Sequence, residues 1–172
     1  MARIRYVEKE TAGPDQEKIL TQLTQKSGKI ANMWKLWGHS PHTLEAYMAF
    51  SKSLVKTSLD SKLRELAYLK ASITNGCAYC AEGHKGPARR AGVTEEQIQE
   101  IGNFAGSGLF SDLEKLVLRY AEELTRTVRT SDEVMTELKK SLSESDIVEL
   151  AITVGLANLT NRFNMSLMTD MD

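Results

Sequence analysis

The feature that most constrains the fold is the recurrence of helix start and stop signals along nearly the whole chain. Thr94 to Gln97 and Ser111 to Glu114 read as capping boxes, and Asp60 reads as a further N-cap residue. No stretch alternates apolar and polar residues between hairpin turns, as strands commonly do. The pattern predicts an all-α, multihelical bundle of about seven or eight helices with no sheet.

Glycine, proline and asparagine set the expected helix boundaries. Gly28 interrupts the first helical stretch, and Ser40-Pro41 starts the next. Asn75-Gly76 separates the helix that begins at Asp60 from a helix that contains both cysteines. The expected helices cover approximately residues 15–37, 41–55, 60–74, 77–91, 112–129, 132–142 and 144–168, with one more starting at residue 94.

The length of 172 residues fits one domain, and no linker or low-complexity tract divides the chain. We therefore expect a single domain over residues 1–172. The last helix is apolar almost all round from Leu150 to Leu159, so it must be covered on several sides. A homo-oligomer would cover it, and a central position within one subunit is the alternative. Polar residues on the same helix either line a subunit contact or are solvated: Asn158, Asn161, Arg162 and Asn164.

Charge and hydropathy narrow the classes of function. Lys and Arg number 22 and Asp and Glu number 23, so the formal net charge of −1 does not suggest a nucleic-acid surface. No apolar run approaches the ~20 residues that span a bilayer, and the first ten residues lack the apolar segment of a secretory signal. We expect a soluble cytoplasmic protein without nucleic-acid or membrane partners.

Both cysteines of the chain lie in one short run, Cys77-Ala-Tyr-Cys80, and His84 follows four residues after Cys80. Near the start of a helix the free backbone N–H groups and the positive end of the dipole favour thiolate over thiol. Cys80 and His84 would share a helix face, so His84 could take the proton of Cys80 or hold its thiolate as an ion pair. Cys77 would then attack what forms on Cys80.

Glu65 is a further candidate, because it lies among apolar residues in the preceding helix. If that helix runs back alongside the cysteine helix, Glu65 could face His84 or Cys77 and relay a proton. It could equally be a surface residue paired with Arg64 or Lys62. The sequence alone leaves both interpretations open.

Together these residues resemble the signature of the AhpD-like alkylhydroperoxidases, within the carboxymuconolactone decarboxylase superfamily. The resemblance rests on Glu65, the Cys77-x-x-Cys80 pair twelve residues later and His84, and it extends over roughly residues 30–168. It implies an all-helical fold, homo-oligomers that are often trimers or hexamers, and reduction of a small hydroperoxide. It implies no cofactor beyond a redox-active disulfide, which an external dithiol, in some members a lipoyl-bearing protein, reduces.

By position, the resemblance makes Cys80 the peroxidatic thiolate and Cys77 the resolving thiol, with His84 and Glu65 as the proton relay. Tyr79 departs from the pattern, because some members carry a relay histidine directly before the second cysteine. A tyrosine hydroxyl is a poor base near neutral pH. The relay would run through Glu65 and His84 alone, or the peroxidase activity would be weak.

Three alternatives use the same cysteines differently. The chain could be a thiol–disulfide oxidoreductase or redox sensor that turns over no peroxide. It could be a non-catalytic helical subunit in which Cys77 and Cys80 are inert core residues. It could also bind zinc through both thiolates and His84, with Glu65 or water as the fourth ligand. No second C-x-x-C or H-x-x-H motif supports the zinc site.

Overall fold

The computed structural model describes residues 1–172, with the side chains of residues 26 and 27 left out of the description. Within that description every regular element is a helix and there is no strand, which confirms the predicted all-α class. The α-helices are α1 (Pro14–Ser27), α2 (Asn32–Trp37), α3 (Pro41–Ser53), α4 (Ser61–Thr74), α5 (Ala78–Arg90), α6 (Glu95–Glu100), α7 (Asp112–Thr127), α8 (Asp132–Ser141) and α9 (Glu144–Leu167). Short 3-10 helices are η1 (Lys9–Thr11), η2 (Leu54–Lys56) and η3 (Ile101–Asn103).

The predicted caps form where the sequence indicates. The Asp60 side chain accepts from the backbone N–H groups of residues 62 and 63, and the hydroxyls of Thr94 and Ser111 each close a capping box. Gly28 ends α1 with φ +72°, a left-handed conformation that glycine adopts without a Cβ penalty. The stretch expected over residues 15–37 is therefore two helices, interrupted at the predicted glycine.

The chain forms two compact units, one of residues 1–53 and 163–172 and the other of residues 54–162. In the first unit α3 packs against α1 and α2, and aromatic rings from Trp34, Trp37, Tyr47 and Phe163 contact one another. The second unit holds both cysteines, Glu65 and His84. The expectation of a single domain over residues 1–172 stays a prediction.

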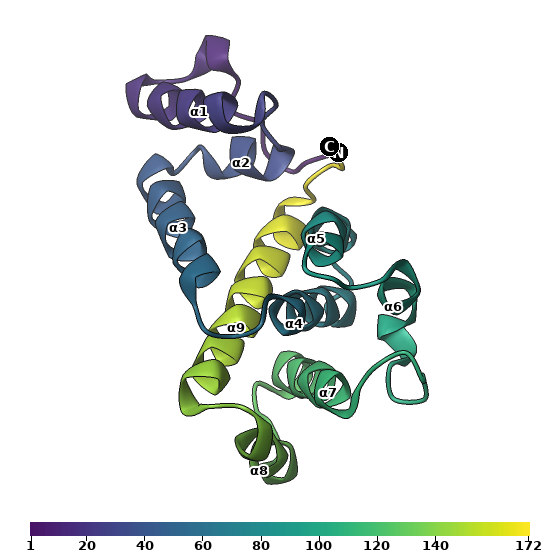
Figure 1. Ribbon diagram of the computed structural model, residues 1–172. Coiled ribbons are helices and arrows are strands. Elements are labelled where there is room, and N and C mark those ends of the chain that lie inside the picture. Colours follow the sequence, from purple (N-terminus) through teal and green to yellow (C-terminus); the bar gives the residue numbers. More distant parts are fainter. The chain divides into compact units, whose positions relative to one another are not determined.

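The second unit is organised around α4. This helix packs against α5 and α7, which flank it in Figure 1. Its apolar side chains are almost fully buried, including Leu66, Ala67 and Leu69, and they join core clusters with Val117 and Leu118 of α7. Because α4 packs against helices on two sides, contacts with neighbouring residues, and not hydration, orient its polar side chains.

Two ion pairs fix α4 against α7. Lys62 contacts Glu114 at 2.6 Å, and Lys70 contacts Glu122 at 3.1 Å. Both partners advance by eight residues between the first pair and the second, so the two helices run parallel. Lys70 is only 3% exposed, and its ammonium group also lies 4.6 Å from the ring centroid of Phe104. The carboxylate of Glu122 and the face of the Phe104 ring therefore offset the cost of burying the charged Lys70.

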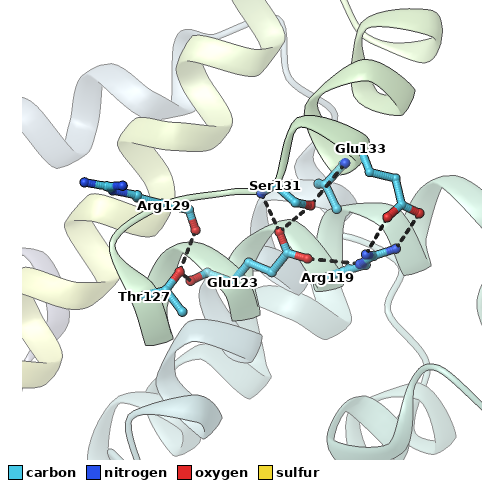
Figure 2. A network of polar contacts seen from close by, with 7 residues as sticks. Arg119, Glu123, Thr127, Arg129, Ser131 and Glu133 are labelled. Carbon is cyan, nitrogen blue, oxygen red and sulfur yellow. Dashed lines mark hydrogen bonds and ion pairs between the residues drawn. The ribbon is translucent and has the colours of Figure 1, made fainter.

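A network of polar contacts joins α7 to α8 (Figure 2). The Glu123 carboxylate accepts hydrogen bonds from the backbone N–H and the hydroxyl of Ser131 at 2.8 and 2.9 Å, and from the Arg119 guanidinium at 3.0 Å. Arg119 also reaches Glu133 on α8. These hydrogen bonds hold the pKa of Glu123 below its usual range. The bond from the Ser131 backbone N–H has the largest effect, followed by those from the Ser131 hydroxyl and Arg119.

Glu123→Gln is expected to lower the free energy of unfolding by about 1 kcal/mol at pH 7, because an amide cannot replace all three of these bonds. The folded-state pKa of Glu123 is depressed, so its contribution is complete above the unfolded value of about 4.3 and is lost as pH falls below it. Denaturant unfolding measures the free energy of unfolding of both proteins at pH 7 and at pH 3. The variant should be less stable than the wild type at pH 7, and this difference should be smaller at pH 3. The exposed Glu133→Gln is the control, with a smaller effect. An equal difference at both pH values would contradict this role of Glu123.

Val128 ends α7 in the left-handed conformation, with φ +61° and 79% exposure. A β-branched residue is strained there, and glycine is not. Val128→Gly is therefore expected to raise the free energy of unfolding by about 1 kcal/mol. Chemical denaturation measures the change, and Val128→Ala, which keeps a Cβ, should gain clearly less. A destabilised glycine variant would show that the backbone strain is not relieved.

Candidate functional site

The sulfur pair lies where α4 ends and α5 begins. α4 ends at Asn75, Gly76 adopts φ +71°, and the Cys77 N–H donates to the carbonyl of Ser72 at 2.9 Å. Cys77 is the N-cap residue of α5, and its sulfur accepts from the Cys80 backbone N–H at 3.3 Å. Cys77 and Cys80 form a disulfide, with their Cα atoms 5.4 Å apart. The predicted sulfur pair is thus present in its oxidised form at the start of a helix.

Both cysteines are buried. Cys77 is 2% exposed and Cys80 is 5% exposed, and both belong to the core cluster that includes Val117 and Leu150. A reactant therefore reaches the sulfurs only when neighbouring side chains move aside. This burial also keeps bulk water away from any intermediate formed on a sulfur.

Glu65 and His84 form the second pair of the site. The Glu65 Oε2 and His84 Nδ1 atoms lie 2.8 Å apart, with the side chains 12% and 30% exposed. The surface pairing that the sequence left open for Glu65 does not occur, because Arg64 donates to the Leu54 carbonyl and Lys62 pairs with Glu114. The packing of α4 against α5 brings Glu65 to His84, as one of the two sequence interpretations expected.

The Glu65–His84 hydrogen bond determines which ring nitrogen of His84 can accept a proton. An ionised carboxylate only accepts, so a neutral His84 ring would carry its hydrogen on Nδ1 and leave the Nε2 lone pair free to take a proton. Cys80 and His84 are four residues apart on α5 and so share a helix face. The arrangement therefore joins a disulfide-bonded sulfur pair and a carboxylate-oriented imidazole through one helix.

A polar network holds the turn before Cys77 against α9. The Asn75 side-chain amide donates to Asn158 at 3.0 Å and to Asn161 at 2.8 Å, and Asn161 donates to the Ser72 hydroxyl at 3.1 Å. Asn161 is fully buried, so of the two alternatives that the sequence left open for it, exposure to solvent is excluded. A buried amide needs internal partners, and α4 supplies them.

Sequence reasoning missed two residues at the site. Tyr68 stacks on His84 with ring centroids 3.4 Å apart and an interplanar angle of 13°, and its hydroxyl lies 2.6 Å from Thr160 Oγ1. The available signal was spacing, because Tyr68 follows Glu65 by three residues and shares its face of α4. Nothing local in the sequence pointed to Thr160, which lies far along the chain on α9.

Over the described side chains, no three or more His, Cys, Asp and Glu groups converge as they would around a metal ion. Among the described helices, none combines the length and apolar character that crossing a bilayer requires.

The chain resembles known proteins in sequence. Residues 41–123 match the model of the Carboxymuconolactone decarboxylase family. The uncharacterized protein YdfG of Bacillus subtilis (strain 168) is 27% identical over 130 residues, which cover 74% of this chain and 88% of YdfG.

Solved structures share the fold. A protein of unknown function from Agrobacterium tumefaciens, with a suggested AhpD role in antioxidant defence, has a TM-score of 0.75 and 25% identity over 80% of this chain and 95% of its own. A peroxidase-related protein with an alkylhydroperoxidase AhpD core, from Ralstonia eutropha JMP134, has a TM-score of 0.85 and 17% identity over 99% of this chain and 92% of its own. The debrominase Bmp8 in complex with 2,3,4-tribromopyrrole has a TM-score of 0.82 and 18% identity over 100% of this chain and 94% of its own.

These findings confirm the resemblance drawn from the sequence. Over residues 41–123 the chain matches the carboxymuconolactone decarboxylase family, and it has an AhpD-like fold.

Proposed function

We propose that this protein is a thiol-dependent hydroperoxide reductase. The observation that carries the proposal is the Cys77–Cys80 disulfide at the start of α5, on the same helix as an imidazole that Glu65 orients. Cys80 is the peroxidatic residue, Cys77 is the resolving residue, and His84 with Glu65 forms the proton relay. The family match and the AhpD-like structures support this assignment.

The first half of the reaction forms a sulfenic acid. His84 Nε2 takes the proton of the Cys80 thiol while Glu65 accepts from Nδ1–H. The thiolate attacks the distal oxygen of the hydroperoxide, the O–O bond breaks, and the departing alkoxide receives the proton from His84 and leaves as an alcohol. Cys80 has lost two electrons to the peroxide and carries one of its oxygens.

The second half closes and then reopens the disulfide. The Cys77 thiol loses its proton and attacks the Cys80 sulfur, the S–O bond breaks, and hydroxide takes that proton to leave as water. An external dithiol, of the lipoyl type or another, reduces the pair through a mixed disulfide and is itself oxidised to a disulfide. We propose that the protein works as a cytoplasmic homo-oligomer, a trimer or hexamer, without a metal or organic cofactor.

A single-turnover assay tests the proposal. Protein reduced with a small dithiol and freed of it is mixed with one equivalent of cumene hydroperoxide. We expect one peroxide consumed and two thiols lost per chain, about 10²-fold or more faster than with free cysteine at the same pH. Sustained turnover with dihydrolipoamide would extend the result to the full cycle.

The same assay separates the alternatives. A thiol–disulfide oxidoreductase or redox sensor would exchange with dithiols and disulfides, yet would consume peroxide no faster than free cysteine. That result would overturn the peroxidase proposal. Metal analysis of the purified protein tests the zinc alternative separately.

A further inference from the structure

The ring of His84 is held on two sides. Its edge bonds to Glu65 through Nδ1, and its face lies almost parallel to Tyr68, with centroids 3.4 Å apart. Neutral aromatic pairs favour offset or edge-to-face arrangements at larger centroid separations. The Tyr68 ring nevertheless covers one face of the imidazole, and this close contact restrains the rotation of the His84 ring.

Tyr68 is itself anchored. The Thr160 hydroxyl lies 3.1 Å from the Leu156 carbonyl and 3.0 Å from the Ala157 carbonyl, one turn back along α9, and donates its hydrogen there. A hydroxyl has one hydrogen, so the 2.6 Å contact between Tyr68 and Thr160 must use the hydrogen of Tyr68. Tyr68 is 6% exposed and Thr160 is 1% exposed, so this bond lies out of competition with water.

We propose that Tyr68 is a positioning residue that fixes the plane of the His84 imidazole, through a stack that Thr160 anchors on α9. The inference rests on the proposed function, because it gives Tyr68 a part in that proton relay. The stack keeps Nδ1 directed at Glu65, which leaves Nε2 as the proton acceptor for Cys80. When His84 takes that proton, its positive ring lies over the electron-rich face of Tyr68, a favourable cation–π arrangement.

The restraint is needed because the side chain of His84 is 30% exposed, so packing alone does not fix its ring. A single hydrogen bond to Glu65 leaves the ring able to rotate about that bond and to exchange its tautomers. A second contact, made to the ring face, removes this freedom. Small misplacements of a reacting group can lower a reaction rate by about two orders of magnitude, so loss of the restraint should measurably slow the reaction of Cys80.

Nitrogen-15 NMR of the histidine side chains in the oxidised protein tests the inference without any turnover. In the wild type we expect His84 to carry its hydrogen on Nδ1 as a single tautomer. Tyr68→Leu removes the stack and should give a mixture of tautomers. Tyr68→Phe and Thr160→Val keep the ring and remove the anchor, so they should give a smaller change of the same kind.

The rate of Cys80 alkylation by iodoacetamide in the reduced protein at pH 7 is the second readout. We expect Tyr68→Leu to slow it about tenfold. Tyr68→Phe and Thr160→Val should each slow it about threefold, and the double variant should be no slower than either single variant, because both remove one hydrogen bond. Tyr120→Phe is the matched control: it removes a hydroxyl from a buried tyrosine of the same core cluster and should leave both readouts unchanged.

The outcomes separate this inference from the proposed function. A His84 tautomer and a Cys80 alkylation rate that are unchanged in Tyr68→Leu would overturn the role of Tyr68, whatever the peroxidase assay shows. If Tyr68→Leu does not fold, as judged by circular dichroism, additive effects of Tyr68→Phe and Thr160→Val, or no effect of either, would overturn it equally. A wild type that consumes no peroxide, yet shows the expected tautomer change in Tyr68→Leu, would support the positioning role and remove only the peroxidase proposal.

Discussion

Cys80→Ser is expected to lower hydroperoxide turnover by at least about 10³-fold, because a serine hydroxyl is a far weaker nucleophile than a thiolate and cannot form a sulfenic acid. The variant should fold as the reduced wild type does, since serine is of similar size to cysteine. Peroxide consumption under single-turnover conditions is the measurement. Turnover that survives Cys80→Ser would remove Cys80 from the reaction.

Cys77→Ser is the matched variant, because it changes the other sulfur of the same pair. It should still consume one peroxide per chain, but it cannot close the disulfide, so the sulfenic acid on Cys80 should accumulate. Dimedone trapping followed by peptide mass spectrometry locates the modified residue. Modification of the remaining cysteine in Cys80→Ser instead would reverse the two assigned roles.

The second large effect is expected at the relay. His84→Ala and Glu65→Gln should each slow the reaction of Cys80 with hydroperoxide by about 10²-fold or more, the usual contribution of general acid–base catalysis. Glu65→Gln keeps the shape of the side chain and removes its charge, so it can no longer select Nδ1–H of His84. Stopped-flow measurement of peroxide loss gives both rates.

Glu82→Gln is the control for the relay. Glu82 lies on α5 as His84 does, but it is exposed and pairs with Lys85, so its loss should leave the rate unchanged. The double variant of Glu65 and His84 should be little slower than the slower single variant, because the two residues act as one unit. Two independent, additive losses would contradict a relay in which Glu65 acts through His84.

The fold was predictable because its boundary signals are local. The cap at Asp60, the capping box at Thr94 and the break at Gly28 depend on residues within one turn of each other, and each forms as expected. The Cys77-x-x-Cys80 pair and the four-residue spacing to His84 are local as well. A capping side chain bonds to N–H groups of the first helical turn that lack a partner within the helix, so a cap depends on its own few residues.

Glu65 marks the limit of local reasoning. Its contact with His84 depends on how α4 packs against α5, so the sequence could offer a relay or a surface pair without deciding between them. Partners that are distant in the sequence were harder still to predict. Lys70 lies among apolar positions of α4, and only the fold reveals Glu122 and the Phe104 ring as its neighbours.

The burial of the sulfurs and the Tyr68–Thr160 anchor also come from packing. Thr160 follows Tyr68 by 92 residues, a separation at which no periodicity in the sequence links them. For Asn161 the sequence left a subunit contact and exposure to solvent both open, because a polar residue on a helix is ordinarily exposed. Its burial is explained by the C-terminal turn of α4, where Ser72 and Asn75 provide its hydrogen bonds.

The central claim is that the Glu65–His84 pair acts on the sulfur of Cys80. A crystal structure of the dithiol-reduced protein tests it most directly, through the distance from His84 Nε2 to Cys80 Sγ. The account predicts that Nε2 lies within hydrogen-bonding reach of that sulfur while Nδ1 keeps its bond to Glu65. An imidazole whose Nε2 is directed away from both sulfurs would contradict the account.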